Sequence, residues 1–160
     1  MGRPPPYARH AAGRPVSPEL VEWVQAYGAW GLCAAAFVGA TLVPVSSEAA
    51  FVAAVAAGLA PATALGWASL GNTAGCLVNY ALGRGARESV GDRLAASRNG
   101  RAALRWTERW GTPALALSWL PVIGDPLTLA AGVGRVPLVW FVPIVAGLRV
   151  ARYAALLWIL

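Results

Sequence analysis

Two carboxylates stand nearly alone inside long apolar stretches of the sequence. Glu48, in the segment TLVPVSSEAA (41–50), is the only charged residue between Trp23 and Gly83, and Asp125 lies in the segment PVIGDP, which interrupts a later apolar run. A charged side chain in hydrocarbon costs about 2.5–3.5 kcal/mol, so it faces other helices or water and often marks an ion or proton path. We therefore predict that Glu48 and Asp125 handle protons or contact a polar headgroup.

Both acids also have a purely structural interpretation at the start of a helix. Ser46, Ser47 and Glu48 would open the second half of a broken helix, where an acid favours the positive end of the helix dipole. Asp125 before Pro126 is a favourable N-cap followed by proline at the first helical position. Because one residue can both cap a helix and carry protons, both interpretations of each acid stay open.

The two acids occupy matching places in two halves of the chain. Each half has an aromatic-glycine pair, an apolar run, a proline four residues before the acid, a second apolar run, a glycine and a proline. These residues are Tyr27-Gly28, Pro44, Glu48, Gly58 and Pro61 in the first half, and Trp110-Gly111, Pro121, Asp125, Gly132 and Pro137 in the second. Interrupted apolar segments at corresponding positions indicate a transporter site. If each half is one hairpin plus one span, the halves have inverted topology and the two acids meet near the bilayer midplane.

The first long apolar span carries polar side chains on one helical stripe. Asn72 and Asn79 lie on this stripe, with Tyr80 beside it, and Gly71 and Gly75 form a small-residue face that lets another helix approach closely. The polar groups either join helices by hydrogen bonds or line a polar path toward the hairpin turns.

The last apolar span contains two arginines, Arg149 and Arg152. A guanidinium inside a membrane needs a partner, so these residues are candidates to pair with Asp125 or Glu48. The alternative is that both lie near the membrane surface and extend their charged ends into the interface.

The composition indicates an integral membrane protein. The chain has 160 residues, of which 58% are hydrophobic and only 12% charged, whereas soluble domains have about 25% charged residues. All 13 basic residues are arginine and the net charge is +6, but seven of them fall in 84–109 between apolar spans, which favours contact with anionic lipid over nucleic acid.

Cys33 and Cys76 are interpreted as apolar fillers. With His10 as its only histidine, the sequence shows no metal motif and no nucleophile-base pair, and we expect no cofactor and no enzymatic activity.

These features predict an all-α integral membrane fold in one domain over 17–160. Its first helix, with Ser17 and Pro18 at its start, is predicted to lie in the interface. The remaining order is a disordered tail over 1–16, a re-entrant hairpin over 28–60, a transmembrane helix over 61–82, a basic amphipathic segment over 83–111, a second re-entrant hairpin over 112–136 and a transmembrane helix over 137–160. One long broken helix is the alternative for 28–60, and a solvated linker helix is the alternative for 83–111.

Three ordered motifs resemble a known family. PVSSEAAFVAAVAAG, GNTAGCLVNYALGR and SWLPVIGDPLTLAAG are similar to segments of the DedA superfamily, also called the VTT or SNARE-associated domain, and most of all to its YqaA-type branch. The resemblance covers 27–153. It implies a multi-pass protein of the bacterial inner membrane with two re-entrant hairpins, related to proteins that move lipids across the bilayer, in some members with protons or membrane potential as the driving force.

Carried over by position, Glu48 matches the acid of the family's first hairpin and Pro121 the proline of its second. Other DedA members place arginines around that proline, where this chain has Ser118 and Gly124-Asp125. Arg149 and Arg152, together with Arg135, are the candidate substitutes for those arginines.

We therefore expect a transporter or scramblase of lipids or lipid-linked carriers, with possible proton coupling at Glu48 and Asp125. Membrane lipids are its expected partners, and a homo-oligomer is compatible with the sequence. The alternative is a non-transporting scaffold or lipid sensor that acts through Arg101, Arg105 and Arg109. If the hairpins are re-entrant, one span separates 83–111 from the N-terminal segment, and the positive-inside rule then places 83–111 in the cytoplasm and the N-terminus outside.

Overall fold

A computed structural model describes residues 18–41, 46–120 and 123–159, and throughout these ranges the ordered elements are helices. They are α1 (Pro18–Ala40), α2 (Ser47–Ala56), α3 (Pro61–Gly85), α4 (Arg87–Ala96), α5 (Arg98–Trp110), the 3-10 helix η2 (Thr112–Trp119), α6 (Gly124–Val133) and α7 (Leu138–Ile159). The predicted all-α class is confirmed. The predicted disordered tail over 1–16 and the predicted breaks at Pro44 and Pro121 lie outside the described residues.

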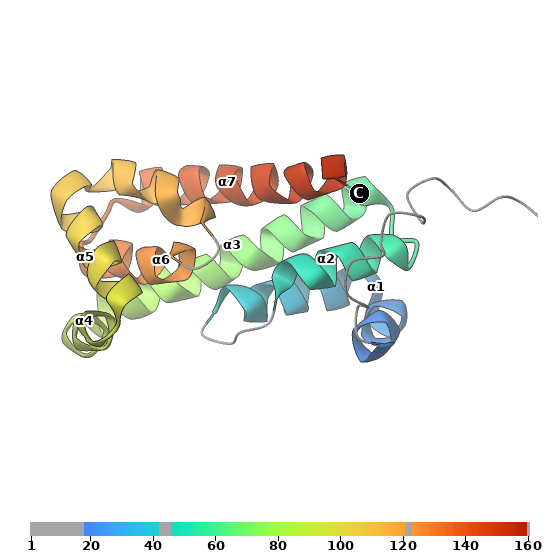
Figure 1. Ribbon diagram of the computed structural model, residues 1–160, viewed down its shortest axis with the longest axis horizontal. Helices are drawn as coiled ribbons and strands as arrows, with labels where there is room; N and C mark the ends of the chain where they lie inside the picture. Colours follow the sequence, from blue (N-terminus) through green and yellow to red (C-terminus); the bar gives the residue numbers. More distant parts are fainter. Residues whose placement is uncertain (1–17, 42–45, 121–122, 160) are drawn as a thin grey trace, which may run out of the picture.

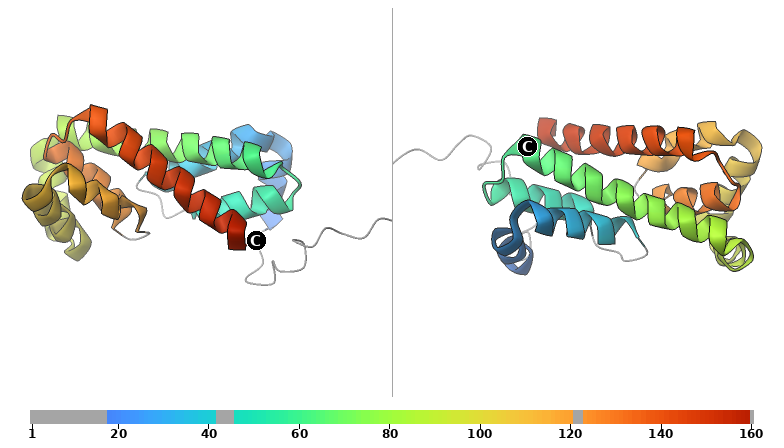
Figure 2. Two further views of the ribbon diagram at one scale, coloured as in Figure 1. Left: turned by 90° about the horizontal axis from the view of Figure 1, so that it is seen from above. Right: turned by 180° about the vertical axis from the view of Figure 1, so that it is seen from behind.

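The elements are arranged along one long axis. Helices α3 and α7 run along it in opposite directions (Figures 1 and 2). The two shorter pairs, α1 with α2 and η2 with α6, enter from opposite ends, and the starts of α2 and α6 lie toward the middle (Figure 1). Because α2 returns against α1 instead of extending it, the alternative of one long broken helix over 28–60 is wrong.

Two crosswise segments cover the ends of the molecule. The first turns of α1 lie across one end, since a break at Gly28 changes the direction of the helix there, and α4 and α5 lie across the other (Figure 1). The basic segment 83–111 therefore forms two helices after the end of α3, where a single amphipathic helix was expected. On α5, Ala103 and Thr107 are buried while the predicted arginine stripe is exposed, as expected for an amphipathic helix.

The same backbone conformation marks the start of both hairpins. Gly28 has φ 55° and ψ −134°, and Gly111 has φ 57° and ψ −127°. A positive φ strongly favours glycine, because a Cβ atom would be strained there. The aromatic-glycine pairs of the two halves are thus structural counterparts, as the sequence pattern predicts.

The ends of the hairpins also correspond, but in a different register from the predicted one. Both α2 and α6 close with a Schellman motif, in which Leu59 N–H donates to Ala54 O at 3.0 Å and Val136 N–H to Ala131 O at 2.9 Å. The residues with positive φ in these motifs are Gly58 and Arg135. Pairing Gly58 with Gly132 is therefore wrong, because each positive-φ residue stands ten positions after the acid of its own hairpin.

Glycines on α3 allow the backbones of neighbouring helices to approach it closely. A Cβ atom on Gly71 would lie 2.1 Å from the carbonyl oxygen of Cys33 in α1, and one on Gly75 would lie 2.6 Å from that of Phe37. On the other side, a Cβ on Gly83 would meet the carbonyl of Leu129 in α6 at 2.2 Å. The predicted close approach along the small-residue face is confirmed, and it makes α3 the central helix.

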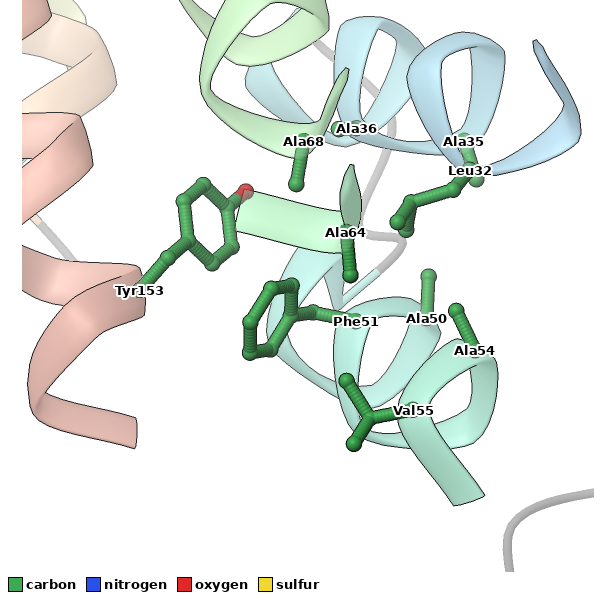
Figure 3. Packing of buried hydrophobic residues seen from close by; sticks show 10 residues of the cluster. All are labelled: Leu32, Ala35, Ala36, Ala50, Phe51, Ala54, Val55, Ala64, Ala68 and Tyr153. Atoms are coloured by element: carbon green, nitrogen blue, oxygen red, sulfur yellow. The ribbon is translucent and has the colours of Figure 1, made fainter. Parts of the chain in front are cut away.

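The helices at this centre share an apolar cluster. Leu32, Phe51 and Tyr153, from α1, α2 and α7, meet beside the alanines of α3 (Figure 3). The rings of Phe51 and Tyr153 are 5.0 Å apart. This packing fixes the first hairpin against the last helix and so positions the polar residues next to it.

Among the described helices, α7 alone has both the length and the hydropathy of a membrane span. Its 22 residues extend about 33 Å, slightly more than the hydrocarbon thickness of about 30 Å. Helix α3 is longer, with 25 residues, but does not reach the same hydropathy. The reason is that its buried positions carry glycine and polar residues such as Asn72 and Asn79, which contact other helices.

Candidate functional site

Glu48 lies in the first turn of α2, immediately after the helix cap. Ser46 is the N-cap, and its Oγ accepts a hydrogen bond from the Ala49 N–H at 3.2 Å. The hydroxyl groups of Ser46 and Ser47 donate to Glu48 Oε2 at 3.1 and 3.4 Å. The other carboxylate oxygen, Oε1, forms an ion pair with Arg152 of α7. Ser46 thus caps the helix, and the acid has a separate partner in Arg152.

Asp125 is not the N-cap of α6, so the capping interpretation of this residue is wrong. The helix begins at Gly124, its cap residue is Ile123, and no side chain makes a capping hydrogen bond. Asp125 Oδ1 instead lies 3.4 Å from Arg149 Nη2. Pro126 follows within the first turn of α6, where its missing N–H would have no helical partner.

The arginines of α7 each hold the acid of a different hairpin. Arg149 is 2% exposed and pairs with Asp125, which is 35% exposed, while Arg152 is 17% exposed and pairs with Glu48, which is 28% exposed. The predicted pairing of each arginine with a hairpin acid is confirmed. Removing either acid would leave an arginine that is at most 17% exposed without a compensating charge.

A chain of hydrogen bonds on α3 connects the two ion pairs. Arg149 Nη2 donates to Cys76 Sγ at 3.2 Å, and the Cys76 thiol donates to Asn72 Oδ1 at 3.8 Å. Asn72 Nδ2 donates to Ser47 Oγ at 3.3 Å and to Tyr153 Oη at 3.2 Å. We call the connected residues the polar network: Ser46, Ser47, Glu48, Asn72, Cys76, Asp125, Arg149, Arg152 and Tyr153.

The other polar residues predicted on α3 lie outside the polar network. Asn79 Nδ2 donates to Ala40 O at 2.8 Å and to Thr128 Oγ1 at 3.3 Å, so it joins the end of α1 to α6. Tyr80 Oη donates to Val136 O at 2.6 Å and accepts from Arg84. These two residues therefore connect helices, which is the packing interpretation of the stripe.

Two members of the polar network have contacts that the sequence did not predict. Cys76 packs in an apolar cluster, as a filler would, and its Sγ also accepts a hydrogen bond from Arg149. Tyr153 was not predicted as a site residue. It follows Arg152 directly and stands four residues after Arg149, so it shares a helical face with Arg149. Arg135, a candidate substitute for the family's arginines, is exposed in the turn after α6.

Glu48 and Asp125 are connected through α7. Within the described part of the chain, neither acid makes a hydrogen bond or ion pair with the other. Their partners Arg149 and Arg152 are three residues apart, about one helical turn. The arrangement places two separable acid–arginine pairs on successive turns of one helix, each joined to a different hairpin.

Comparison with known proteins assigns the fold to a family. The family model described as the VTT domain matches residues 43–147, which include both hairpin acids. The chain belongs to the VTT-domain family. The inner membrane protein YqaA of Escherichia coli is 36% identical over 135 residues, which cover 82% of this chain and 92% of the relative, and the protein of the same name from Shigella flexneri matches equally. A Haemophilus influenzae protein is 33% identical over 138 residues, 78% of this chain and 82% of that relative.

This VTT-domain protein is thus of the YqaA type, as the sequence motifs indicated. No solved structure matches it.

Proposed function

We propose that this VTT-domain protein moves lipids or lipid-linked carriers across the bacterial inner membrane, the membrane for which its YqaA relatives are named. The observation that carries the proposal is the pair of ion pairs on α7, Arg149 with Asp125 and Arg152 with Glu48. Ionisable residues inside a membrane protein mark substrate and proton paths, and here they join the two hairpins to one helix.

The proposed placement has the long axis crossing the bilayer, with both hairpins re-entrant. Helices α2 and α6 have ten residues each, about 15 Å, which is half of a hydrocarbon core. The opposite directions of α3 and α7 and the matching glycines at 28 and 111 support an inverted repeat.

The tryptophans support the same placement. Trp residues are enriched at both membrane interfaces. At one end of the axis, Trp30 near the start of the apolar part of α1 contacts Trp67 of α3, with ring centroids 4.4 Å apart. At the other end, Trp106 and Trp110 of α5 stack, and Trp140 is exposed in the first turn of α7. The two groups would lie at the two surfaces of the bilayer.

In the proposed mechanism the acids exchange their arginine partners for protons. When Asp125 or Glu48 takes up a proton, it becomes neutral and its attraction to arginine falls. The freed guanidinium can then bind a phosphate of the lipid headgroup, because its planar donors fit phosphate oxygens. Loss of the proton restores the ion pair and releases the headgroup, while the lipid tails stay in the bilayer throughout.

The proposed orientation follows from charge. Segment 83–111, which includes α4 and α5, carries seven arginines and three acids, a net charge of +4. Segment 1–27 carries three arginines and two acids. The positive-inside rule then puts the end covered by α4 and α5 in the cytoplasm.

The test is transport by purified protein in liposomes that contain a panel of labelled lipids, with and without a pH gradient. We expect Glu48→Gln and Asp125→Asn to abolish transport while each variant keeps its helical circular dichroism. Glu88→Gln, an exposed acid in the first turn of α4, is the matched control and should transport like wild type. Wild-type transport by both hairpin variants would refute the role of the acids.

A second candidate function is lipid sensing or scaffolding through α5. Arg101, Arg105 and Arg109 are all exposed, and the stacked Trp106 and Trp110 lie on the same helix. Such a surface suits anionic lipid. The test is whether variants restore the growth of a strain that lacks the gene. If the variant with all three arginines changed to glutamine fails to do so while Glu48→Gln and Asp125→Asn succeed, this candidate replaces transport.

A further inference from the structure

A cavity of about 450 Å³ lies between the end of α3, helix α4 and the first turns of α6. Most of its wall is apolar, and the apolar lining includes Leu82, Leu94 and Leu129. Cavities of this size commonly hold small-molecule ligands, with a few polar groups that fix their orientation. The residues of the wall therefore determine which ligand would fit.

The polar groups of the wall include one cation and one anion. The cation is Arg93 of α4, which has the hydroxyl groups of Ser89 and Ser97 near it on the same wall. Within the described ranges Arg93 forms no ion pair, since the two ion pairs found there belong to Arg149 and Arg152. Arg93 can therefore bind an external anion.

The anion of the wall is Asp125, the acid of the second hairpin. Its pair with Arg149 leaves its side chain 35% exposed, and only Oδ1 is engaged. Asp125, in the first turn of α6, lines this cavity and also pairs with Arg149. The cavity thus connects the surface at α4 with the polar network.

We propose that this cavity binds the headgroup of a zwitterionic aminophospholipid, with the phosphate at Arg93 and the ammonium group at Asp125; this rests on the proposed lipid transport. A headgroup without an amine would have no donor for the carboxylate oxygen of Asp125 that Arg149 does not engage. A quaternary ammonium has no N–H group to donate to the carboxylate. A primary ammonium with a phosphate satisfies both charged residues at once.

The wall of the cavity offers an exit for the lipid chains. Leu82, on the last turns of α3, is 45% exposed as well as being part of the wall. With the long axis across the membrane, this side borders the hydrocarbon of the bilayer. A bound headgroup can therefore stay attached to chains that remain among the other lipids.

The test uses the full-length protein in phosphatidylcholine nanodiscs that contain a small fraction of phosphatidylethanolamine with a photoreactive group near its phosphate. Cross-linked peptides are mapped by mass spectrometry. We expect labelling of α4 and of the start of α6, and a reduction of at least fivefold when unlabelled phosphatidylethanolamine is added, with no reduction by phosphatidylglycerol. Arg93→Gln should lower labelling at least fivefold, and Arg93→Lys should restore most of it. Arg87→Gln, an exposed arginine on the same helix but outside the cavity, is the matched control and should label like wild type.

Competition by phosphatidylglycerol equal to that by phosphatidylethanolamine would overturn the proposal, and so would labelling spread evenly over the exposed face of α7. The labelling experiment and the transport experiment can fail independently of each other. If wild-type protein transports lipid without cavity labelling, the cavity assignment fails and transport stands. If the cavity is labelled but no lipid is transported in liposomes, only the proposed function fails.

Discussion

Arg149 and Arg152 lie one turn apart on α7, and each binds the carboxylate of a different hairpin: Asp125 of α6 and Glu48 of α2. A single helix therefore holds both hairpins through charge. Any movement that shifts α7 relative to one hairpin must stretch one of these pairs. This arrangement allows the two pairs to be tested independently.

Double-mutant cycles on the two pairs should give unequal coupling energies. Arg149 is far more enclosed than Arg152, so its charge depends more on its partner. We expect a coupling of about 1–3 kcal/mol for Asp125→Asn with Arg149→Gln, and a smaller one for Glu48→Gln with Arg152→Gln. The measurement is unfolding of purified protein in mixed micelles. Equal couplings would show that burial does not govern the pairs.

Ser46→Ala should separate capping from the function of the acid. Loss of the hydrogen bond from Ala49 N–H to Ser46 Oγ should lower the free energy of unfolding by about 1 kcal/mol. Transport should persist, since Glu48 keeps its pair with Arg152. Liposome transport and thermal unfolding check both parts, and complete loss of transport in a folded Ser46→Ala protein would contradict the separation.

Asn72 should be more important to stability than its neighbour Tyr153. Asn72→Leu removes the hydrogen bonds to Ser47 and Tyr153 together, whereas Tyr153→Phe removes only one of them. Each such bond contributes about 0.5–1.5 kcal/mol, and buried polar groups left without a partner add to the loss. We expect Asn72→Leu to unfold at a lower temperature than Tyr153→Phe. The reverse order would remove Asn72 from the centre of the polar network.

Two glycine-to-alanine changes on α3 should act in opposite directions. Gly71→Ala would place a Cβ 2.1 Å from the Cys33 carbonyl oxygen, which forces α1 away and should cost about 1–3 kcal/mol. A Cβ atom added at Gly66 would have no neighbouring atom within 4 Å, so Gly66→Ala should stabilise the helix by about 0.4–1 kcal/mol. Thermal unfolding of both variants is the measurement. Similar effects for both would mean that α1 does not contact α3 along this face.

The glycines that open the two hairpins should be equally intolerant of substitution. Gly28→Ala and Gly111→Ala meet no neighbouring atom within 4 Å, so their cost comes from the positive φ alone. Backbone strain of this kind costs about 1–3 kcal/mol per residue. We expect closely similar losses of stability in the two variants, measured by unfolding in mixed micelles. A large difference would argue against the structural equivalence of the two halves.

Much of this architecture could be predicted from local features of the sequence. The apolar runs, the aromatic-glycine pairs and the acids near prolines fix where helices begin, turn and end, because propensity and dihedral limits act over a few residues. Gly71 and Gly75 predicted that another helix approaches α3 closely, and the fold showed that this helix is α1. The sequence also predicted that Ser46, Ser47 and Glu48 begin a helix, and the structure identified Ser46 as its cap.

The tertiary structure decided the roles of the residues that interact over long sequence separations. Whether Asp125 caps α6 or pairs with Arg149, and whether Cys76 is a filler or a contact of that arginine, depends on which faces of α3, α6 and α7 meet. The register of the repeat was also decided there, since Arg135 takes the place that glycine has in the first half. The sequence by itself determined two broken halves with one acid each. Only packing determined the partners, because a side chain's charge is compensated by whatever the fold brings within a few ångströms.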